Sequence, residues 1–195
     1  MTAGAEATSG ARAGTASRPV PLLETARLRL RLRPPALDDA PLPYARYTQD
    51  PIVTRNLTWQ PHDSVERTRM FLQRCLAGIA DGSVWPWVLI ERDDDRPIGM
   101  IELRLFGHRA DLGYVLARDR WGRGLMTEAA RTVVDSSLAD PAIFRVGAVT
   151  DIDNLASARV LDKIGMQREG LLRRWLVHPN LSPEPRDCWS FGRVR

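Results

Sequence analysis

The sequence predicts a single α/β domain, an α+β arrangement in which helices pack on a mixed β-sheet. Three observations support this prediction. Leucine alternates strictly with arginine from Arg27 to Arg33, which is the period of a strand with one buried face. A Gly-x-Gly turn at residues 122–124 separates a predicted strand from a helix that is apolar around much of its circumference. The expected elements follow the order β-α-α-β-β-β-α-β-α-β-β, with crossover helices in the second half.

The first half of the domain begins with the alternating strand, which ends at Pro34. Asp38 and Asp39 are candidate caps for a short helix that extends through Tyr47, although two prolines make its start irregular. A longer helix follows Ser64, because its apolar residues recur at helical spacing. These residues are Leu72, Cys75, Leu76 and Ile79.

Three strands with short connections come next. We expect them over 84–91, 98–105 and 111–117, with a turn at Asp93–Asp95. Pro86 restricts the start of the first of them to a sheet edge or a bulge, because proline cannot donate a hydrogen bond. The remaining elements are a helix over 125–138, a strand over 145–151, a helix over 155–164 and two strands over about 169–177 and 188–194.

Length and composition limit the domain count and the partners. The 195 residues leave room for one domain and a tail, and residues 1–20 consist largely of Ala, Gly, Thr and Ser. We therefore expect a disordered tail over 1–20 and the folded domain over 21–195. No run approaches the ~20 apolar residues of a membrane helix, so we expect no membrane partner and a cytoplasmic location. Cys75 and Cys188 form neither a metal-ligand pattern nor a disulfide framework, so no metal is expected.

The charge distribution argues against nucleic acid as a partner. The formal net charge is +4, and Lys163 is the single lysine among 28 basic residues. Arginine suits bidentate binding of phosphate or carboxylate better than lysine does. No basic run with interleaved aromatic residues occurs, and a nucleic-acid surface requires such a cluster. An anionic ligand, or no ligand at all, remains as the alternative.

The segment around residues 122–124 is the most informative for chemistry. Gly122 and Gly124 allow a ligand to approach the backbone, and the first turn of the following helix offers unpaired N–H groups to an anion. A tight strand-to-helix turn without any ligand is the structural alternative. The segment lacks the third glycine of the G-x-G-x-x-G fingerprint and does not match the G-x-x-x-x-G-K-[ST] fingerprint. The neighbouring segments must therefore decide between a phosphate site and a plain turn.

Four segments together resemble a known family. Trp121-Gly-Arg-Gly-Leu-Met-Thr-Glu-Ala129 resembles motif A of the GNAT superfamily of acyl-CoA-dependent N-acetyltransferases, in the form of its Rim-type (RimJ/RimL-like) branch of ribosomal-protein alanine N-acetyltransferases. The segments Leu23–Leu28, Asp153–Met166 and Glu169–Arg174 resemble further motifs of that branch in the same order. The resemblance covers residues 22–195 and implies a GNAT-like single domain.

The resemblance implies that acetyl-CoA binds as the acyl donor, with no metal. Its pantetheine arm would lie along the strand over 112–117, and its diphosphate at the glycine turn. The residues expected at the donor are Tyr114, Val115, Leu116, Arg118, Arg120, Gly122, Arg123, Gly124, Leu125, Met126, Thr127 and Asn154. Asp119 stands where motif A often has Gln or Arg, so neighbouring arginines would supply the positive charge. A solvated loop is the alternative for Arg118 and Arg120.

The leaving thiolate needs a donor group, and the resemblance offers one. Many members of the superfamily use a tyrosine in the helix over 155–164, but Leu161 stands at that position here. Ser157 is then the catalytic candidate, with Asn154 binding the pantetheine. Ordinary capping of the helix by Asn154 and Ser157 is the alternative, and the two roles are compatible.

The general base has two candidates, Asp111 and Glu102. A carboxylate has an unperturbed pKa near 4, so either group needs desolvation or a bridging water to accept a proton from an ammonium. Some Rim enzymes carry a glutamate at the position of Leu176, and that base is missing here. Asp111 as a plain strand-edge acid, or an acceptor that is already deprotonated, are the alternatives.

We expect direct transfer of an acetyl group from acetyl-CoA to a primary amine, either a protein N-terminus or a small molecule. In the family, the region of Trp59 and His62 and the loop from His178 to Asp187 border the acceptor. Simple packing is the alternative for Trp59 and His62. A non-catalytic acyl-CoA-binding or partner-binding module is the alternative function. A homodimer and a monomer both remain open.

Overall fold

The computed structural model describes residues 22–25, 30–91 and 96–195. The expected tail over 1–20, the first three residues (27–29) of the alternating Leu-Arg segment and the turn at Asp93–Asp95 lie outside these residues. Within them, no helix combines the length and the apolar character that a membrane crossing requires.

One sheet of eight strands runs through the molecule in the order β1-β2-β3-β4-β5-β6-β8-β7. Neighbouring strands are antiparallel except β5 and β6, which are parallel. The strands are β1 (Leu23–Glu24), β2 (Leu30–Arg33), β3 (Val84–Glu91), β4 (Pro97–Phe106), β5 (Arg109–Leu116), β6 (Arg145–Asp151), β7 (Gln167–Val177) and β8 (Pro185–Val194). The order confirms the predicted mixed α/β class.

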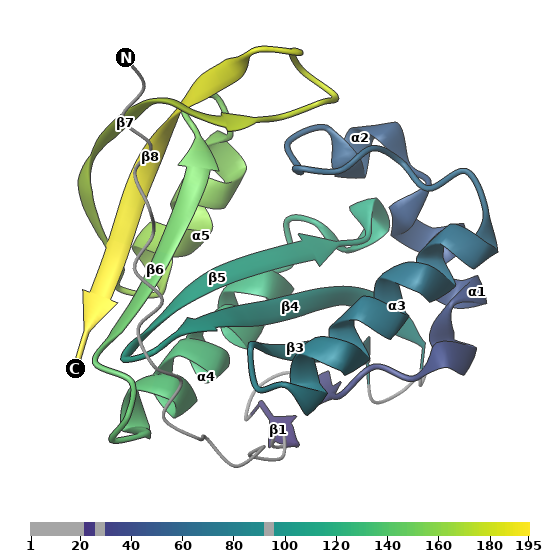
Figure 1. The fold of residues 1–195 in the computed structure, drawn as a ribbon, viewed down its shortest axis with the longest axis horizontal. Helices are drawn as coiled ribbons and strands as arrows, with labels where there is room; N and C mark the ends of the chain where they lie inside the picture. The colour runs from purple at the N-terminus through teal and green to yellow at the C-terminus, as the bar shows by residue number, and fades with distance from the viewer. Residues whose placement is uncertain (1–21, 26–29, 92–95) are drawn as a thin grey trace, which may run out of the picture.

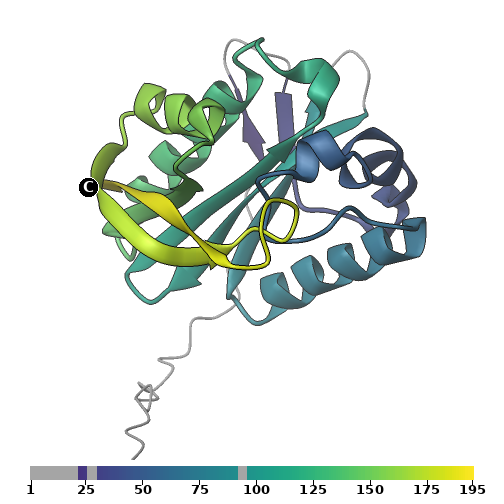
Figure 2. The same cartoon turned by 90° about the horizontal axis from the view of Figure 1, so that it is seen from above.

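Helices cover both faces of the sheet (Figure 1), and Figure 2 shows the three layers from above. α1 to α3 lie on one face, and α4 and α5 on the other. The helices are η1 (Leu37–Asp39), α1 (Pro41–Pro43), η2 (Tyr44–Thr48), α2 (Pro51–Thr54), α3 (Val65–Ala80), η3 (Arg118–Arg120), α4 (Leu125–Ala139) and α5 (Leu155–Lys163).

Each helix layer has its own hydrophobic core. Leu72 and Cys75 of α3 pack with Val88 and Met100 of the central strands. The core on the opposite face is larger and joins α4 and α5 to β4, β5, β6 and β8. Because both faces of β3 and β4 are covered, their sequences read as continuous apolar runs rather than as alternating patterns.

Two elements differ from the sequence-based expectation. The opening segment contains a two-residue strand, β1, that pairs with β2, so Leu23 lies opposite Leu32. The single short helix expected through Tyr47 is a succession of short turns from η1 to α2, because Pro41 and Pro43 interrupt regular helical bonding. Pro86 lies in β3 beyond the residues that pair with β2, as its missing N–H predicts.

Candidate active site

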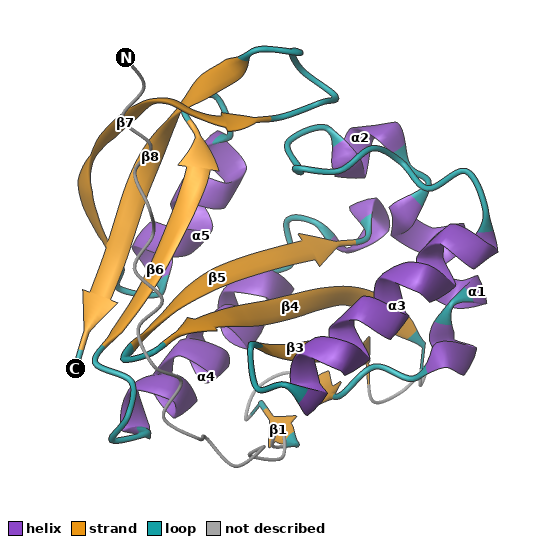
Figure 3. Cartoon of the chain, viewed as in Figure 1, coloured by secondary structure: helices purple, strands orange, loops and turns teal. Residues whose placement is uncertain are grey.

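Strands β5 and β6 lie side by side at one end of the sheet and diverge toward the other (Figure 3). Their register pairs Arg109–Asp111 with Arg145–Gly147 and ends there. β4 pairs with β5 along the full length of β5. The second half of β5 is therefore hydrogen-bonded to β4 along one edge, and its other edge has no strand partner among the described residues. The divergence therefore leaves a gap in the sheet that is lined by the backbone of β5.

The amides that face this gap follow from the strand alternation. The Ala117 amide donates to the Ile98 carbonyl of β4 at 2.8 Å. Since successive backbone groups of a strand point to opposite edges, the amides of Leu112, Tyr114 and Leu116 point into the gap. Val115, which was also expected at the donor, directs its backbone toward β4, and its side chain packs on the α3 face.

The glycine turn connects β5 to α4 and is open to solvent. Gly122 and Gly124 have φ of 74° and 76°, the left-handed conformation that favours glycine. A Cβ on Gly122 would meet no atom within 4 Å, so the inner side of the turn is free. Gly124 is the N-cap of α4 and contributes no side-chain hydrogen bond. The amides of the first turn, Leu125 to Thr127, are thus available to an anion, as the motif predicts.

The three arginines around the turn are held by carboxylates to different degrees. Arg120 is largely buried and donates to Glu91 at 2.8 Å and to Asp119 at 2.7 Å. Arg123 is 3.3 Å from Glu91, and its side chain is 54% exposed. Arg118 is similarly exposed. Arg118 and Arg123 can therefore turn toward an anion in the turn, whereas Arg120 mainly fixes the turn to β3.

Ser157 lies on the first turn of α5 and contacts β5. Its amide donates to Asn154 Oδ1 at 3.2 Å, which is the expected cap of the helix. Its hydroxyl is 2.7 Å from the hydroxyl of Tyr114. Burial raises the pKa of Tyr114 to about 12, although the hydrogen bond with Ser157 partly opposes this. Leu161, at the position of the absent tyrosine, is buried in the core.

Glu102 and Asp111 lie on the α3 face of the sheet, opposite to Ser157. Glu102 pairs with Gly113 across β4 and β5, and a Cβ on Gly113 would be 3.6 Å from Glu102 Oε1. Burial raises the pKa of Glu102, and the charge of Arg104, 3.6 Å away, partly opposes this. Asp111 is more exposed and is 3.3 Å from Arg109. Of the two predicted bases, Glu102 has the desolvated environment that proton abstraction requires.

Comparison with known proteins identifies the architecture. A family model described as an acetyltransferase (GNAT) domain matches residues 29–167. The chain belongs to the GNAT acetyltransferase family. Its acyltransferase class is therefore as the motifs predicted. Within the described residues, no group of three His, Cys, Asp or Glu side chains is placed to hold a metal ion.

A curated N-acetyltransferase is similar to this chain in sequence, and solved Rim-type enzymes are similar to it in structure. The uncharacterized N-acetyltransferase YoaA of Bacillus subtilis is 31% identical over 178 residues, which cover 90% of this chain and 98% of YoaA. RimJ of Mycobacterium smegmatis, solved in complex with a CoA-disulfide, has a TM-score of 0.79 at 22% identity, covering 90% of this chain and 88% of RimJ. RimL, a ribosomal L7/L12 α-N-protein acetyltransferase solved with coenzyme A, has a TM-score of 0.77 at 19% identity, covering 90% of this chain and 97% of RimL. These structures share the fold.

The loop between β7 and β8 in this GNAT protein contacts the α2 region through Asn180, a residue that the sequence analysis did not single out. Asn180, between β7 and β8, donates from Nδ2 to the carbonyls of Thr54 and Trp59 at 2.7 and 2.8 Å. Trp59 packs against His62 and Phe71, with ring centroids 4.9 and 6.3 Å away. The regions expected to border the acceptor are thus brought together.

His62 in this cluster is a buried, neutral imidazole. Burial, together with the charges of Arg67 and Arg74, lowers the pKa of His62 to about 4. Its Nδ1 is 2.8 Å from Thr68 Oγ1, which in turn contacts Thr48 Oγ1 at 3.0 Å. These bonds fix the orientation of the ring.

The loop end of the β7–β8 hairpin contains a buried ionic cluster. The Asp151 carboxylate, at the end of β6, accepts hydrogen bonds from Arg186 Nε at 2.6 Å and Nη2 at 3.1 Å. His178 Nε2 lies 3.9 Å from both Asp151 Oδ2 and Cys188 Sγ. Burial alone would raise the pKa of Asp151, but its hydrogen bonds and the charge of Arg186 hold it below the usual value. The cluster links the β7–β8 hairpin to the end of β6.

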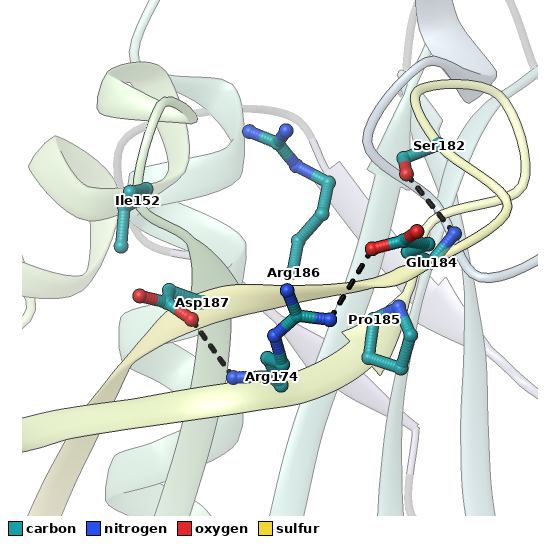
Figure 4. Close-up of a pocket in the computed structure, with 7 residues that line it drawn as sticks. All are labelled: Ile152, Arg174, Ser182, Glu184, Pro185, Arg186 and Asp187. Carbon is teal, nitrogen blue, oxygen red and sulfur yellow. Dashed lines mark hydrogen bonds and ion pairs between the residues drawn. The ribbon is translucent and has the colours of Figure 1, made fainter.

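Beside this cluster, the hairpin surrounds an open cavity of about 410 Å³ (Figure 4). Arg174 lies in a bulge of β7 with φ of 45°, and its amide donates to Asp187 Oδ1 at 2.8 Å. Its guanidinium donates to Glu184 at 3.2 Å, so the cations lining the cavity have carboxylate partners. The cavity is lined by Ile152, Arg174, Ser182, Glu184, Pro185, Arg186 and Asp187.

Proposed function

We propose that the chain transfers the acetyl group of acetyl-CoA directly to the nitrogen of a primary amine, with the donor in the gap between β5 and β6. Acetyl-CoA supplies the acetyl group as an activated thioester. One observation carries the proposal: a strand edge with unpaired amides leads to an uncapped helix N-terminus. The fold is that of RimL and RimJ, which were solved with coenzyme A and a CoA-disulfide.

The chain offers a separate group for each part of the donor. The first three amides of α4 would bind the diphosphate, with Arg118 and Arg123 adding positive charge. The gap-facing amides of β5 would bind the pantetheine arm, and one of them would stabilise charge on the acetyl oxygen. The Oδ1 of Asn154 caps α5, which leaves its amide nitrogen to bind the pantetheine.

Glu102 is our candidate for the general base, with Asp111 as the second. Its raised pKa makes it a better proton acceptor than an exposed carboxylate, and it lies over Gly113, where the gap begins. The amine must lose a proton to attack, and Glu102 would accept it directly or through a water. Asp111 is farther along β5 and is neutralised by Arg109.

The two sides of the sheet then have different tasks. Tyr114 and Ser157 lie on the α5 face, whereas Glu102 and Asp111 lie on the α3 face. The donor would enter along α4 and α5, and the amine would approach from the side of α3 and the β7–β8 loop. A protein N-terminus and a small amine both present the nitrogen that this arrangement requires.

Calorimetric titration with acetyl-CoA, followed by thiol release over a panel of amines, tests the proposal. The panel should contain short peptides with free N-termini and small primary amines. We expect micromolar binding of acetyl-CoA and thiol release with at least one amine. Absence of binding would refute the proposal. Binding without thiol release for any amine would instead indicate the non-catalytic acyl-CoA-binding module.

Single variants then assign the roles. Glu102→Gln is expected to reduce kcat about 100-fold, and Asp111→Asn much less, because general-base catalysis contributes about 10²–10⁴-fold. Glu66→Gln is a matched control, since it makes the same change at a carboxylate that is 70% exposed and pairs with Arg69 at 3.5 Å on the surface. A larger loss for Asp111→Asn than for Glu102→Gln would reverse the assignment.

A further inference from the structure

Tyr114 contributes a side chain to the site as well as a backbone amide. It belongs to β5, and its ring packs against the core on the α4 and α5 face. Its hydroxyl oxygen lies 2.7 Å from Ser157 Oγ and 3.3 Å from the Ser157 carbonyl. The two residues are 43 positions apart in the chain, so this contact depends on how α5 docks on the sheet.

Either hydroxyl can donate in the 2.7 Å contact, and the phenol can also donate to the Ser157 carbonyl at 3.3 Å. Burial raises the pKa of Tyr114 to about 12, so the phenol stays protonated and has one hydrogen to donate. Its shorter contact is to Ser157 Oγ. Apart from Tyr114, no described residue hydrogen-bonds Ser157 Oγ. When Ser157 Oγ accepts from Tyr114, its own hydrogen is therefore left to donate to something else.

The chemistry of the leaving group determines what that hydrogen can do. A thiol has an unperturbed pKa near 8.5, so a hydroxyl as weakly acidic as that of serine or Tyr114 does not protonate the departing sulfur. As the N–C bond forms and the C–S bond breaks, the electron pair of the C–S bond goes to sulfur. The proton of the amine goes to the base, and the thiolate later takes a proton from water. A hydrogen bond to sulfur stabilises the charge in the meantime.

We propose that Tyr114 is a positioning residue that directs the hydroxyl of Ser157 toward the sulfur of the departing coenzyme A. The inference rests on the proposed function and adds a second residue to the leaving-group side. A phenylalanine at this position would fill the same space against α5. Ser157 would then be free to turn toward a backbone carbonyl of its own helix, as serines in helices often do.

A double-mutant cycle tests this proposal in single-turnover experiments, which report the chemical step. Tyr114→Phe is expected to slow acetyl transfer about 3- to 10-fold, and Ser157→Ala about 10- to 100-fold. In the Ser157→Ala background, Tyr114→Phe should change the rate by less than about 1.5-fold, because nothing remains to be oriented. The affinity for coenzyme A should stay within about twofold in every variant.

Tyr44→Phe is the matched control, because it removes a phenol whose hydrogen bond goes to the Asp63 carbonyl on the surface. It should leave the rate unchanged. Replacement of Tyr114 by 3-fluorotyrosine keeps the ring and gives a stronger donor, so it should retain at least the wild-type rate. This variant tests the proposal even if Tyr114→Phe loses its fold.

Three outcomes would overturn the inference. Equal effects of Tyr114→Phe with and without Ser157 would show that the two residues act independently. Weaker binding of coenzyme A at an unchanged rate would indicate a purely structural role, and a slow fluorotyrosine variant would exclude donation by the phenol. A wild-type protein that acetylates no amine would refute the proposed function, and this inference with it.

Discussion

Replacing Arg186 by alanine tests how strongly the β7–β8 hairpin is held to the sheet. Arg186 forms two hydrogen bonds with Asp151, and the Asp151 side chain is 0% exposed. The substitution leaves a carboxylate in the interior without its main partner. Unlike the loss of a surface ion pair, this loss exposes the full cost of burying a charge.

The size of the effect follows from the burial of both partners. Removing one partner of a fully buried pair costs about 3–5 kcal/mol. The Arg186 side chain keeps 28% of its surface exposed, so water can partly replace it, and we expect about 2–4 kcal/mol. For a chain of this size, about 2–4 °C of Tm corresponds to each kcal/mol. The variant should therefore unfold about 5–15 °C below the wild type.

The pH dependence separates this mechanism from a loss of packing. The pKa of Asp151 is held below its usual value, so its ionised form stabilises the native protein above the unfolded pKa of about 3.9. That contribution is lost as the pH falls through the lower, native value. In Arg186→Ala the unpaired buried carboxylate has a raised pKa instead. The difference between variant and wild type should then be largest near pH 7 and already smaller at pH 4, because the raised pKa lets the buried carboxylate of the variant take up a proton first.

Thermal unfolding followed by circular dichroism at pH 7 and pH 4 measures both effects. Adding Asp151→Asn to Arg186→Ala should recover more than half of the lost stability, because it removes the buried charge. Arg67→Ala, at an exposed ion pair, should stay within about 0.5 kcal/mol. A Tm change of less than 2 °C for Arg186→Ala at pH 7, or an equal change at both pH values, would refute the reasoning.

Three further predictions concern the site. Gly124→Ala should cost about 1–2 kcal/mol in unfolding, since φ is 76°, and should weaken acetyl-CoA binding in calorimetry. Because the pKa of Glu102 is raised, kcat should begin to fall, as the pH is lowered, at a pH above about 4.3, the ordinary pKa of a glutamate. For the same reason, Glu102→Gln should slightly increase the Tm at pH 7, because the ionised form is disfavoured in the fold and that cost disappears. Asn180→Ala removes hydrogen bonds of 2.7 and 2.8 Å to Thr54 and Trp59 and should increase KM for the amine more than KM for acetyl-CoA in steady-state assays.

The elements predicted best are those whose sequence pattern is local. The strand over 145–151 was predicted at its observed bounds, and the helix over 155–164 to within a residue. Both have clear limits, with Asn154 as a side-chain cap for the helix. The glycine turn could also be predicted, because the positive φ at both of its glycine positions favours glycine and the two glycines can be read from the sequence. These features depend on neighbouring residues and not on the tertiary structure.

The contacts that complete the site could not be predicted in this way. Tyr114 was expected at the donor through its backbone, and nothing near it in the sequence indicates that its hydroxyl meets Ser157. The bridge from Asn180 to Thr54 joins positions 126 residues apart. Arg120 was a candidate for phosphate binding, but Glu91 on a distant strand is its partner. Each of these pairings is decided by how layers dock, which a single sequence does not reveal.

The short register between β5 and β6 has a consequence for the molecule as a whole. Because it ends at Asp111 and Gly147, few hydrogen bonds link the two halves of the sheet directly. A ligand that spans the gap would act as a crosslink between them, and binding energy would add to the resistance to unfolding. Hydrogen exchange should then slow at amides on both halves, including many that the ligand never touches. The slowing of exchange would thus measure how much of the protein has bound a donor. Acyl donors of different chain length could then be ranked by affinity in the absence of an amine acceptor.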